Sequence, residues 1–228
     1  LESGEIKLGE DVVAEINKDR RLKIRSNHTA THILHESLKQ VLGVHVQQSG
    51  SLVTDEKLRF DLTHYEKIAD SQIIEIENKI NNIIRENYEV STTVQDFEKA
   101  RKNGATALFG EKYEDKVRVI DIPGFSMELC GGTHVFRTGD IGVFKIISES
   151  SLSTGVRRIE GITGQKVINR IHYTDSIIQE SKDLLKANED QIIEKTLVLI
   201  DKNKELEKKV KQGFSSSSLF DLDALISK

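Results

Sequence analysis

Two pairs of side chains with metal-ligand chemistry stand out in this sequence. His28 and His32 are four residues apart, so on a helix both imidazoles project from one face and can reach the same ion. Cys130 and His134, in the segment CGGTH, repeat this spacing in a glycine-rich loop whose backbone can turn around an ion. Three imidazoles and a thiolate are a donor set that favours zinc. The sequence therefore predicts one zinc ion per chain, bound by these four residues.

This donor set argues against one class of zinc enzyme but leaves open whether the zinc is catalytic or structural. Residue 29 is a threonine, whereas a zinc peptidase of the HExxH type needs a glutamate there, so a metalloprotease is disfavoured. Four protein ligands usually close a structural site, while a catalytic zinc keeps one position open. Three alternatives remain: one ligand is labile, the ion accepts a fifth ligand from substrate, or the zinc shapes a pocket in which other groups place the attacking water.

Hydrophobic periodicity predicts the helix that must carry the first pair. An apolar stripe ends at Gly43, and Asn27 or Ser26 is a suitable N-cap, which predicts a helix over 28–42. A second amphipathic helix is predicted to end near Asn87. The two stripes consist of Ile33, Leu34, Leu38, Val41 and Leu42, and of Ile73, Ile76, Ile80, Ile83 and Ile84.

Short runs rich in Val, Ile and Phe, separated by Gly, Asp or Pro, predict strands. The predicted strands cover 51–54, 57–62, 88–95, 117–122, 125–129, 142–148 and 155–162, and a hairpin or strand pair is predicted within 5–16. Because the strands cluster after the helices, we expect an α+β fold with one clustered, mainly antiparallel sheet and packed helices.

The C-terminal part predicts a helical appendage. Residues 165–212 contain no Gly or Pro and carry interspersed charges of both signs, as in one or two long solvated helices. Apolar residues recur every seventh position from Ile171 to Leu206, but the position four residues on is polar, so a helical hairpin or antiparallel coiled-coil-like partner is favoured over a parallel zipper. This segment could support self-association. Residues 213–228 predict a flexible joint and the truncated start of a further domain.

Composition excludes several classes of protein. Among 228 residues, 37 acidic side chains outnumber 33 basic ones, which argues against coating nucleic acid by bulk charge but allows a local basic patch. No apolar run approaches the roughly 18 residues that a membrane span needs, so no membrane partner is expected. A single cysteine and the lack of a signal-peptide pattern predict a soluble protein of a reducing compartment, the cytoplasm.

Seven segments resemble the editing domain of alanyl-tRNA synthetase in order and spacing. They are NHTATHILHESLKQVLG, QQSGSLV, LRFDLTHYE, GATALFGEKY, VRVIDI, ELCGGTHVFRTGDIG and GVRRIEGITG, and the match spans about residues 1–165. HxxxH and CGGTH within these flanks make the resemblance specific. It implies that 1–20 are the tail of a preceding small β-barrel, 21–164 the editing (deacylase) domain, 165–212 a helical connector and 213–228 a joint with the start of a C-terminal domain.

The resemblance also implies an ester hydrolase that removes serine or glycine from mischarged alanine tRNA. No segment resembles the aminoacylation domain or its ATP-binding motifs. We therefore expect a fragment of a longer synthetase that does not aminoacylate, with ATP as a ligand of the full-length enzyme only. A pocket sized for alanine cannot exclude glycine and rejects an added hydroxyl only about a hundredfold, so a second, hydrolytic site is needed. Serine's hydroxyl offers that site a handle, whereas glycine clearance has no such explanation.

The same resemblance implies functional roles for particular residues. His28, His32, Cys130 and His134 become the zinc ligands, and Gln48, in HVQQSGSLV, matches a pocket glutamine that influences serine and glycine clearance. The hydroxyls of Thr29 and Ser49 would help to read the serine side chain. Arg157 and Arg158, in GVRRIEG, would contact the terminal phosphates of the tRNA, or else lie on a solvated strand face. His35, His45, His64 and His172 are expected to be ordinary histidines.

The bond to be broken is an activated ester, so the site need only position water and stabilise an oxyanion. Zinc or the amides of Gly131 and Gly132 could do so, with Cys130 and Gln48 beside them. The motif shows no Ser-His-Asp set and no catalytic carboxylate, so attack assisted by the free hydroxyl of the terminal ribose is an alternative. Competing hypotheses are a free-standing trans-editing protein, the related threonyl-type domain, and a zinc-stabilised module that binds tRNA ends without hydrolysis.

Overall fold

The computed structural model describes residues 4–5, 7–106 and 113–217, without the side chains of 213–217. The chain divides into two compact units, Leu1–Asn169 and Arg170–Lys228. The first unit holds the predicted metal ligands, and it is described first.

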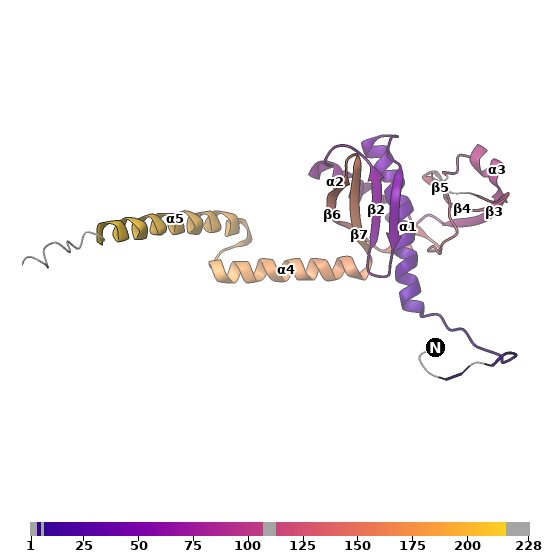
Figure 1. Cartoon of the computed structure of the whole chain (residues 1–228), viewed down its shortest axis with the longest axis horizontal. Coiled ribbons are helices and arrows are strands. Elements are labelled where there is room, and N and C mark those ends of the chain that lie inside the picture. Colours follow the sequence, from indigo (N-terminus) through magenta and orange to yellow (C-terminus); the bar gives the residue numbers. More distant parts are fainter. Residues whose placement is uncertain (1–3, 6, 107–112, 218–228) are drawn as a thin grey trace, which may run out of the picture. The chain divides into compact units, whose positions relative to one another are not determined.

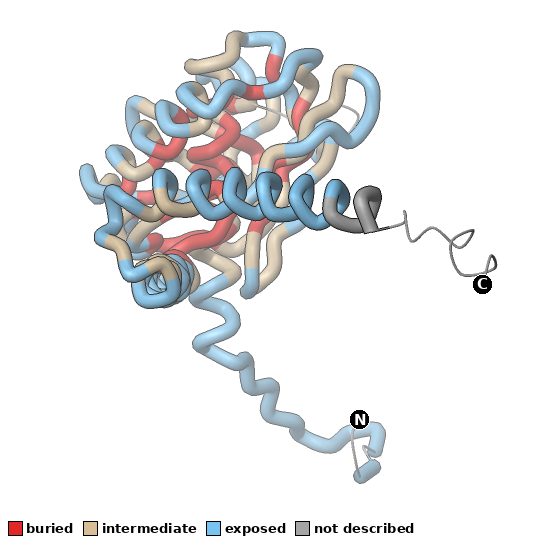
Figure 2. Tube along the Cα trace, turned by 90° about the vertical axis from the view of Figure 1, so that its left-hand side faces the viewer, coloured by how far each residue is buried: buried red, intermediate tan, exposed pale blue. Residues whose placement is uncertain are grey.

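A four-stranded antiparallel sheet forms the centre of the first unit (Figure 1). Its order is β1 (Gln48–Val53), β2 (Leu58–Thr63), β7 (Val156–Thr163) and β6 (Phe144–Ser153). Leu58, Phe60 and Leu62 of β2 alternate onto one face and are fully buried, because helices α1 (Lys18–Leu42) and α2 (Asp70–Glu86) pack there. The buried residues gather where these helices meet the sheet (Figure 2).

Helix α1 begins ten residues earlier than the sequence analysis predicts. Its N-cap is Asn17, whose side chain accepts a hydrogen bond from the amide of Arg20. Residues 18–27 contain no Gly or Pro and are rich in the helix formers Lys and Arg, so propensity extends the helix beyond its buried stripe. Asn27, predicted as a cap, is instead inside the helix, where it donates to the carbonyl of Thr54, directly after β1, and accepts from the hydroxyl of Thr163 in β7. The predicted ends are confirmed: Gly43 ends α1, and Asn87 ends α2 in the left-handed region with φ 54°.

The remaining strands form a separate sheet, so the prediction of one clustered sheet is wrong. This three-stranded antiparallel sheet has the order β3 (Ser91–Asp96), β4 (Lys116–Ile122) and β5 (Ser126–Leu129). Helix α3 (Phe97–Lys102), which periodicity did not reveal because it is short, packs on it with Asp96 as N-cap. This sheet has a small core of its own on the side of α3, while Ile120 and Ile122 of β4 belong to the main core. The mixed α/β character and the antiparallel pairing are as predicted.

The hairpin predicted within 5–16 is also wrong. The described residues of this segment are exposed and belong to no strand, and only a turn at Lys7–Glu10 is hydrogen-bonded. An isolated hairpin has no apolar face to bury and is marginal by itself. The assignment of residues 1–20 to the tail of a small β-barrel stays a prediction.

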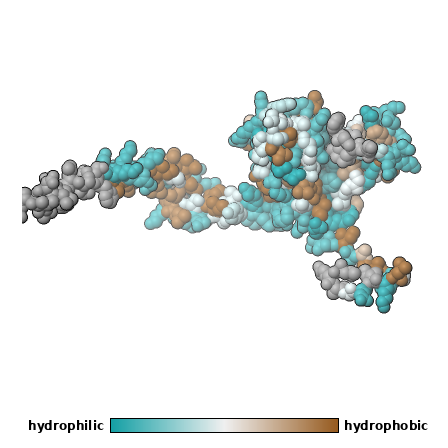
Figure 3. Space-filling model, in the orientation of Figure 1, coloured by the Kyte–Doolittle hydropathy of each residue, from teal (hydrophilic) through white to brown (hydrophobic). Residues whose placement is uncertain are grey.

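Residues 165–212 form two helices, most of which belong to the second unit. Helix α4 (Gln165–Leu185) begins in the first unit, and α5 (Ile192–Ser217) follows a short 3-10 turn, Glu189–Gln191. Many of their apolar side chains are exposed, 48% at Ile171 and 77% at Leu184, and hydrophobic surface is visible along this segment (Figure 3). Hairpin formation and self-association therefore stay predictions. Among the described residues, no helix has the length and hydropathy of a membrane span.

Candidate metal centre

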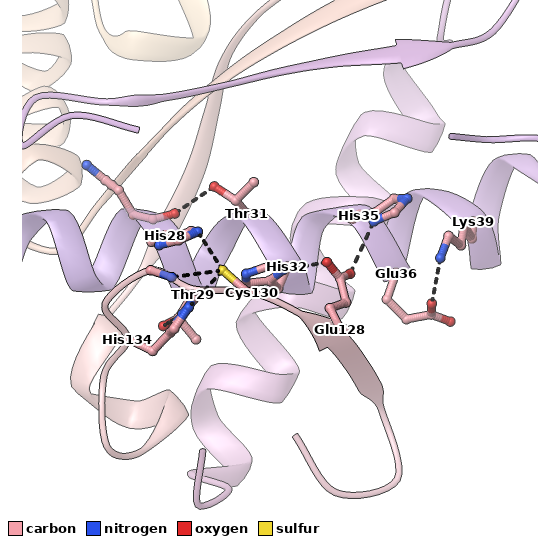
Figure 4. Close-up of polar contacts among 12 residues, drawn as sticks. His28, Thr29, Thr31, His32, His35, Glu36, Lys39, Glu128, Cys130 and His134 are labelled. Atoms are coloured by element: carbon pink, nitrogen blue, oxygen red, sulfur yellow. Dashed lines mark hydrogen bonds and ion pairs between the residues drawn. The ribbon is translucent and has the colours of Figure 1, made fainter. Parts of the chain in front are cut away.

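The four predicted ligands meet between α1 and the loop that follows β5. His28 and His32 lie one turn apart on α1, while Cys130 directly follows the last residue of β5 and His134 lies four residues further along the loop. One ligand atom from each of the four lies within 4.8 Å of all the others. In the close-up the Cys130 sulfur lies among the imidazoles (Figure 4).

The spacing of the donor atoms fits a tetrahedral metal ion. Cys130 Sγ lies 3.4 Å from Nε2 of His28 and 3.4 Å from Nε2 of His134. Zinc bonds of about 2.3 Å to sulfur and about 2.05 Å to nitrogen at the tetrahedral angle imply a sulfur–nitrogen separation of about 3.6 Å. Nε2 of His32 is buried and has no hydrogen-bond partner among the described residues, as is appropriate for a metal ligand. The residues present therefore suit zinc.

Gly132, the second glycine of CGGTH, must lack a side chain because its backbone lies directly against the ring of His28. A β-carbon on Gly132 would lie 2.0 Å from Cε1 and 2.5 Å from Nδ1 of His28, whereas a β-carbon on Gly131 would meet nothing within 4 Å. The amide of Gly132 also donates to Cys130 Sγ at 3.4 Å. This loop can therefore hold sulfur and imidazole together only because Gly132 has no side chain.

Two of the four proposed ligands, His32 and His134, contact buried side chains through Nδ1, the ring nitrogen that does not face the ion position. Glu128 accepts from Nδ1 of His32 at 2.5 Å and from Nδ1 of His35 at 3.1 Å (Figure 4). Thr29 Oγ1 lies 3.2 Å from Nδ1 of His134. The Glu128 carboxylate can only accept, so it keeps a proton of His32 on Nδ1 and leaves Nε2 as the ligating atom, whereas the Thr29 hydroxyl can donate or accept and fixes only the position of the His134 ring.

The electrostatics of the cluster favour a bound cation. Burial raises the pKa of the Cys130 thiol, but hydrogen bonds from the surrounding histidines outweigh it and lower that pKa to about 3. Burial and the neighbouring histidine charges lower the pKa of His134 to about 4, despite its hydrogen bond to Cys130. For His32, burial lowers the pKa, but the negative charge of Glu128 outweighs it and raises the pKa to about 10. At neutral pH the sulfur is therefore a thiolate and His32 is its protonated partner, so a metal ion that binds Nε2 of His32 must displace that proton and take over its positive charge.

Comparison with known proteins shows what the chain is similar to. Residues 117–160 match the family model described as "Threonyl and Alanyl tRNA synthetase second additional domain". The chain is 48% identical over 218 residues to the alanine–tRNA ligase of Haemophilus influenzae, which covers 96% of this chain and 25% of that protein. It is 49% identical over 209 residues to that of Pseudoalteromonas translucida, covering 92% and 24%. The chain belongs to the alanine–tRNA ligase family. It spans about a quarter of the length of these curated relatives.

Gln48 and Ser49, the two residues predicted to line the aminoacyl pocket, lie on β1 at the edge of the four-stranded sheet. Gln48 opens β1 opposite Leu62, and the register puts both side chains on the face of the sheet that α1 covers. Ser49 is exposed at the β-bulge that follows, a feature that re-aims neighbouring side chains. Within the described residues, neither side chain hydrogen-bonds to the four ligands, so their substrate roles stay predictions.

The other predicted substrate residues already have protein partners. Thr29 is fully buried between His134 and the amide of Val135. Arg157 pairs with Glu149 at 2.5 Å, and Arg158 makes a bidentate pair with Asp61 at 2.7 and 2.9 Å. The phosphate role of these arginines stays a prediction, and their carboxylate partners compete with it.

Three residues at the site escaped the sequence analysis. Glu128 supplies a carboxylate where none was expected, and His35, expected to be ordinary, is its buried second partner. Arg118 donates from Nη1 to the carbonyls of Cys130, at 3.0 Å, and of Gly132. Glu128 was detectable, because it lies two residues before Cys130 on an extended segment and so shares its face. Arg118 carried no such signal.

Proposed function

We propose that this chain is a zinc-dependent ester hydrolase that deacylates alanine tRNA mischarged with serine or glycine. Membership of the alanine–tRNA ligase family supports an editing or tRNA-binding role. The observation that carries the hydrolytic proposal is the cluster of His28, His32, Cys130 and His134, of which His134 lines a cavity of about 370 Å³ together with Gly131 and Gly132. A substrate bound in this cavity would lie beside one ligand of the metal centre.

The protein groups around the cluster have separable tasks. The four ligands would hold zinc, which when bound polarises a carbonyl oxygen or lowers the pKa of water. Glu128 and Thr29 keep Nε2 of His32 and His134 aimed at the ion position. Arg118 holds the backbone of the CGGTH loop through its carbonyls. The preorganisation of these groups is the catalytic contribution of the chain itself.

The ester needs an oxyanion donor and a reader for its amino acid. The amide of Gly132 donates to Cys130 Sγ, so Gly131, exposed at the cavity wall, is the better oxyanion donor of the pair. We assign Gln48 to the aminoacyl pocket and Ser49 to the serine hydroxyl. A polar partner that alanine leaves unpaired would discriminate serine from alanine, because an unsatisfied buried group costs about 1–3 kcal/mol.

Deacylation of defined tRNAs tests the proposal. The zinc-loaded chain is incubated with alanine tRNA carrying serine, glycine or alanine, and with threonine tRNA carrying serine, and loss of the ester is followed. We expect rapid loss of serine and glycine from alanine tRNA and slow loss of alanine. Cys130→Ala removes a ligand and should abolish both zinc binding and hydrolysis. Tight tRNA binding by zinc-loaded chain without ester loss would refute hydrolysis and favour the binding module, and preference for threonine tRNA would favour the threonyl type.

Further proposals concern the chain as a whole. We expect no alanylation from ATP and alanine, a cytoplasmic location that keeps the Cys130 thiol reduced, and self-association through the exposed apolar residues of α4 and α5. Sedimentation of the full chain over a range of concentrations tests the last of these.

A further inference from the structure

The cavity beside the metal centre is lined by arginines without acidic neighbours. Arg21 and Arg25 come from α1, Arg118 comes from β4, and the CGGTH loop closes the wall from Gly131 to His134. No carboxylate belongs to the wall among the described residues. This arginine cavity, about 370 Å³ in volume, therefore concentrates three positive charges in a chain whose net charge is −4.

The three guanidinium groups differ from the two arginines that the sequence analysis assigned to phosphate. Arg157 and Arg158 are neutralised by carboxylates, whereas Arg21, Arg25 and Arg118 have no carboxylate partner in the described part of the chain. Arg25 and Arg118 are nevertheless held in place. Nε of Arg25 donates to Thr133 Oγ1 at 2.9 Å, and Nη1 of Arg118 donates to the carbonyls of the loop. Their other N–H groups remain available to an anion, and little further ordering is needed.

Helical spacing directs this charge toward the metal cluster. Arg21, Arg25, His28 and His32 follow at intervals of four, three and four residues, so they share one face of α1. At a rise of about 1.5 Å per residue, Arg25 lies about 4.5 Å and Arg21 about 10.5 Å from His28 along the helix axis. An anion bound by these arginines would therefore lie within one or two helix turns of a substrate group bound at the metal cluster.

The wall also carries an exposed aromatic ring. Phe136 is 72% exposed and lines the cavity, and the guanidinium of Arg25 lies 5.1 Å from its ring centre. Exposed aromatic rings beside basic grooves serve as stacking platforms for unpaired bases. The combination of arginines and a ring indicates a nucleotide rather than a bare anion.

We propose that the arginine cavity binds a phosphodiester near the 3′ end of single-stranded RNA, with the terminal ribose directed at the metal cluster. The role of the ribose ester rests on the proposed function. The phosphodiester contact rests on Arg21, Arg25 and Arg118 alone. Guanidinium forks match the oxygens of a phosphodiester, and each contact adds sequence-independent affinity that falls with salt.

The test uses Arg21→Gln in the full zinc-loaded chain, with Lys23→Gln as the matched control. Both residues are exposed on α1 and both substitutions remove one positive charge, but Lys23 lies two positions on and does not line the cavity. The probe is a single-stranded oligoribonucleotide with the sequence of a tRNA 3′ end, and a second probe has a neutral methylphosphonate as its last linkage. Binding is measured by fluorescence anisotropy over a range of salt concentrations.

We expect Arg21→Gln to weaken binding of the charged probe about threefold to tenfold and to reduce its salt slope by about 0.7. Lys23→Gln should leave both unchanged, and the methylphosphonate should weaken binding to the unmodified chain more than binding to Arg21→Gln, in which only Arg25 and Arg118 remain to contact the charge. Equal effects of the two substitutions would overturn the proposal. It is also overturned if inorganic phosphate binds in an Arg21-dependent way while both probes bind alike, since the cavity would then hold only free phosphate.

Hydrolysis separates this proposal from the proposed function. If the expected binding pattern appears but serine-charged alanine tRNA is not deacylated, the hydrolase assignment fails and the phosphodiester site stands. If deacylation occurs and Arg21→Gln leaves its KM unchanged, the phosphodiester site fails and the hydrolase stands. Zinc content should not change in either variant, because Arg21 contacts none of the four ligands.

Discussion

The contact between Gly132 and His28 makes a sharp prediction about metal affinity. A β-carbon at Gly132 would lie 2.0 Å from Cε1 of His28, where carbon atoms need about 3.5 Å, so ring and loop must separate by about 1.5 Å. Metal–ligand distances tolerate only about 0.2 Å. Gly132→Ala should therefore detach His28 from the ion position and lower zinc affinity by at least the tenfold to hundredfold typical of damaged supporting contacts, about 1.4–2.7 kcal/mol.

Gly131→Ala is the matched control, since its β-carbon meets nothing within 4 Å and neither glycine has a positive φ. Zinc affinity is measured by competition with a chromogenic chelator, and circular dichroism checks that each variant is folded. We expect Gly131→Ala to bind zinc within about threefold of the unmodified chain, because an ordinary alanine fits there. Wild-type affinity in folded Gly132→Ala would refute the argument, because it would mean that His28 is not a required ligand or that the loop yields freely.

Further predictions concern stability, support, pH and selectivity. Zinc at a hundred times its dissociation constant should raise the free energy of unfolding by about 2.7 kcal/mol, seen as a chelator-sensitive melting temperature; a chelator-insensitive melt would contradict metal binding. Glu128→Gln should lower zinc affinity about tenfold to hundredfold while Glu36→Gln, in an outer ion pair with Lys39, does not, by the same chelator assay. Burial and then repulsion from His45 lower the pKa of His64 below 6.5, so the unfolded state binds more protons and stability should fall as pH drops below 6.5; an NMR titration showing no downward shift would refute this. Gln48→His should sharply slow serine-ester hydrolysis at unchanged zinc content, and normal rates would remove Gln48 from the pocket.

Local sequence was sufficient wherever the deciding interaction lies within a few residues. The spacing of four identified both ligand pairs, because a helix turn and a tight loop each bring such residues together. Periodicity identified α2, and Asn87 its end, because a buried stripe and a left-handed cap are local features. The same local signals failed where exposed residues continue a helix, as they do between Asn17 and His28.

Long-range placement was decided by the tertiary structure. The strands divide into two sheets because pairing depends on which strands meet in space, which alternation alone does not encode. Glu128 reaches His32 across 96 positions and Arg118 reaches the loop carbonyls from a neighbouring strand, so neither role is written in spacing. The arginine cavity likewise exists only because α1, β4 and the CGGTH loop converge. Residue types determined which ion suits the centre, and packing determined what surrounds it, since support and access depend on contacts between distant segments.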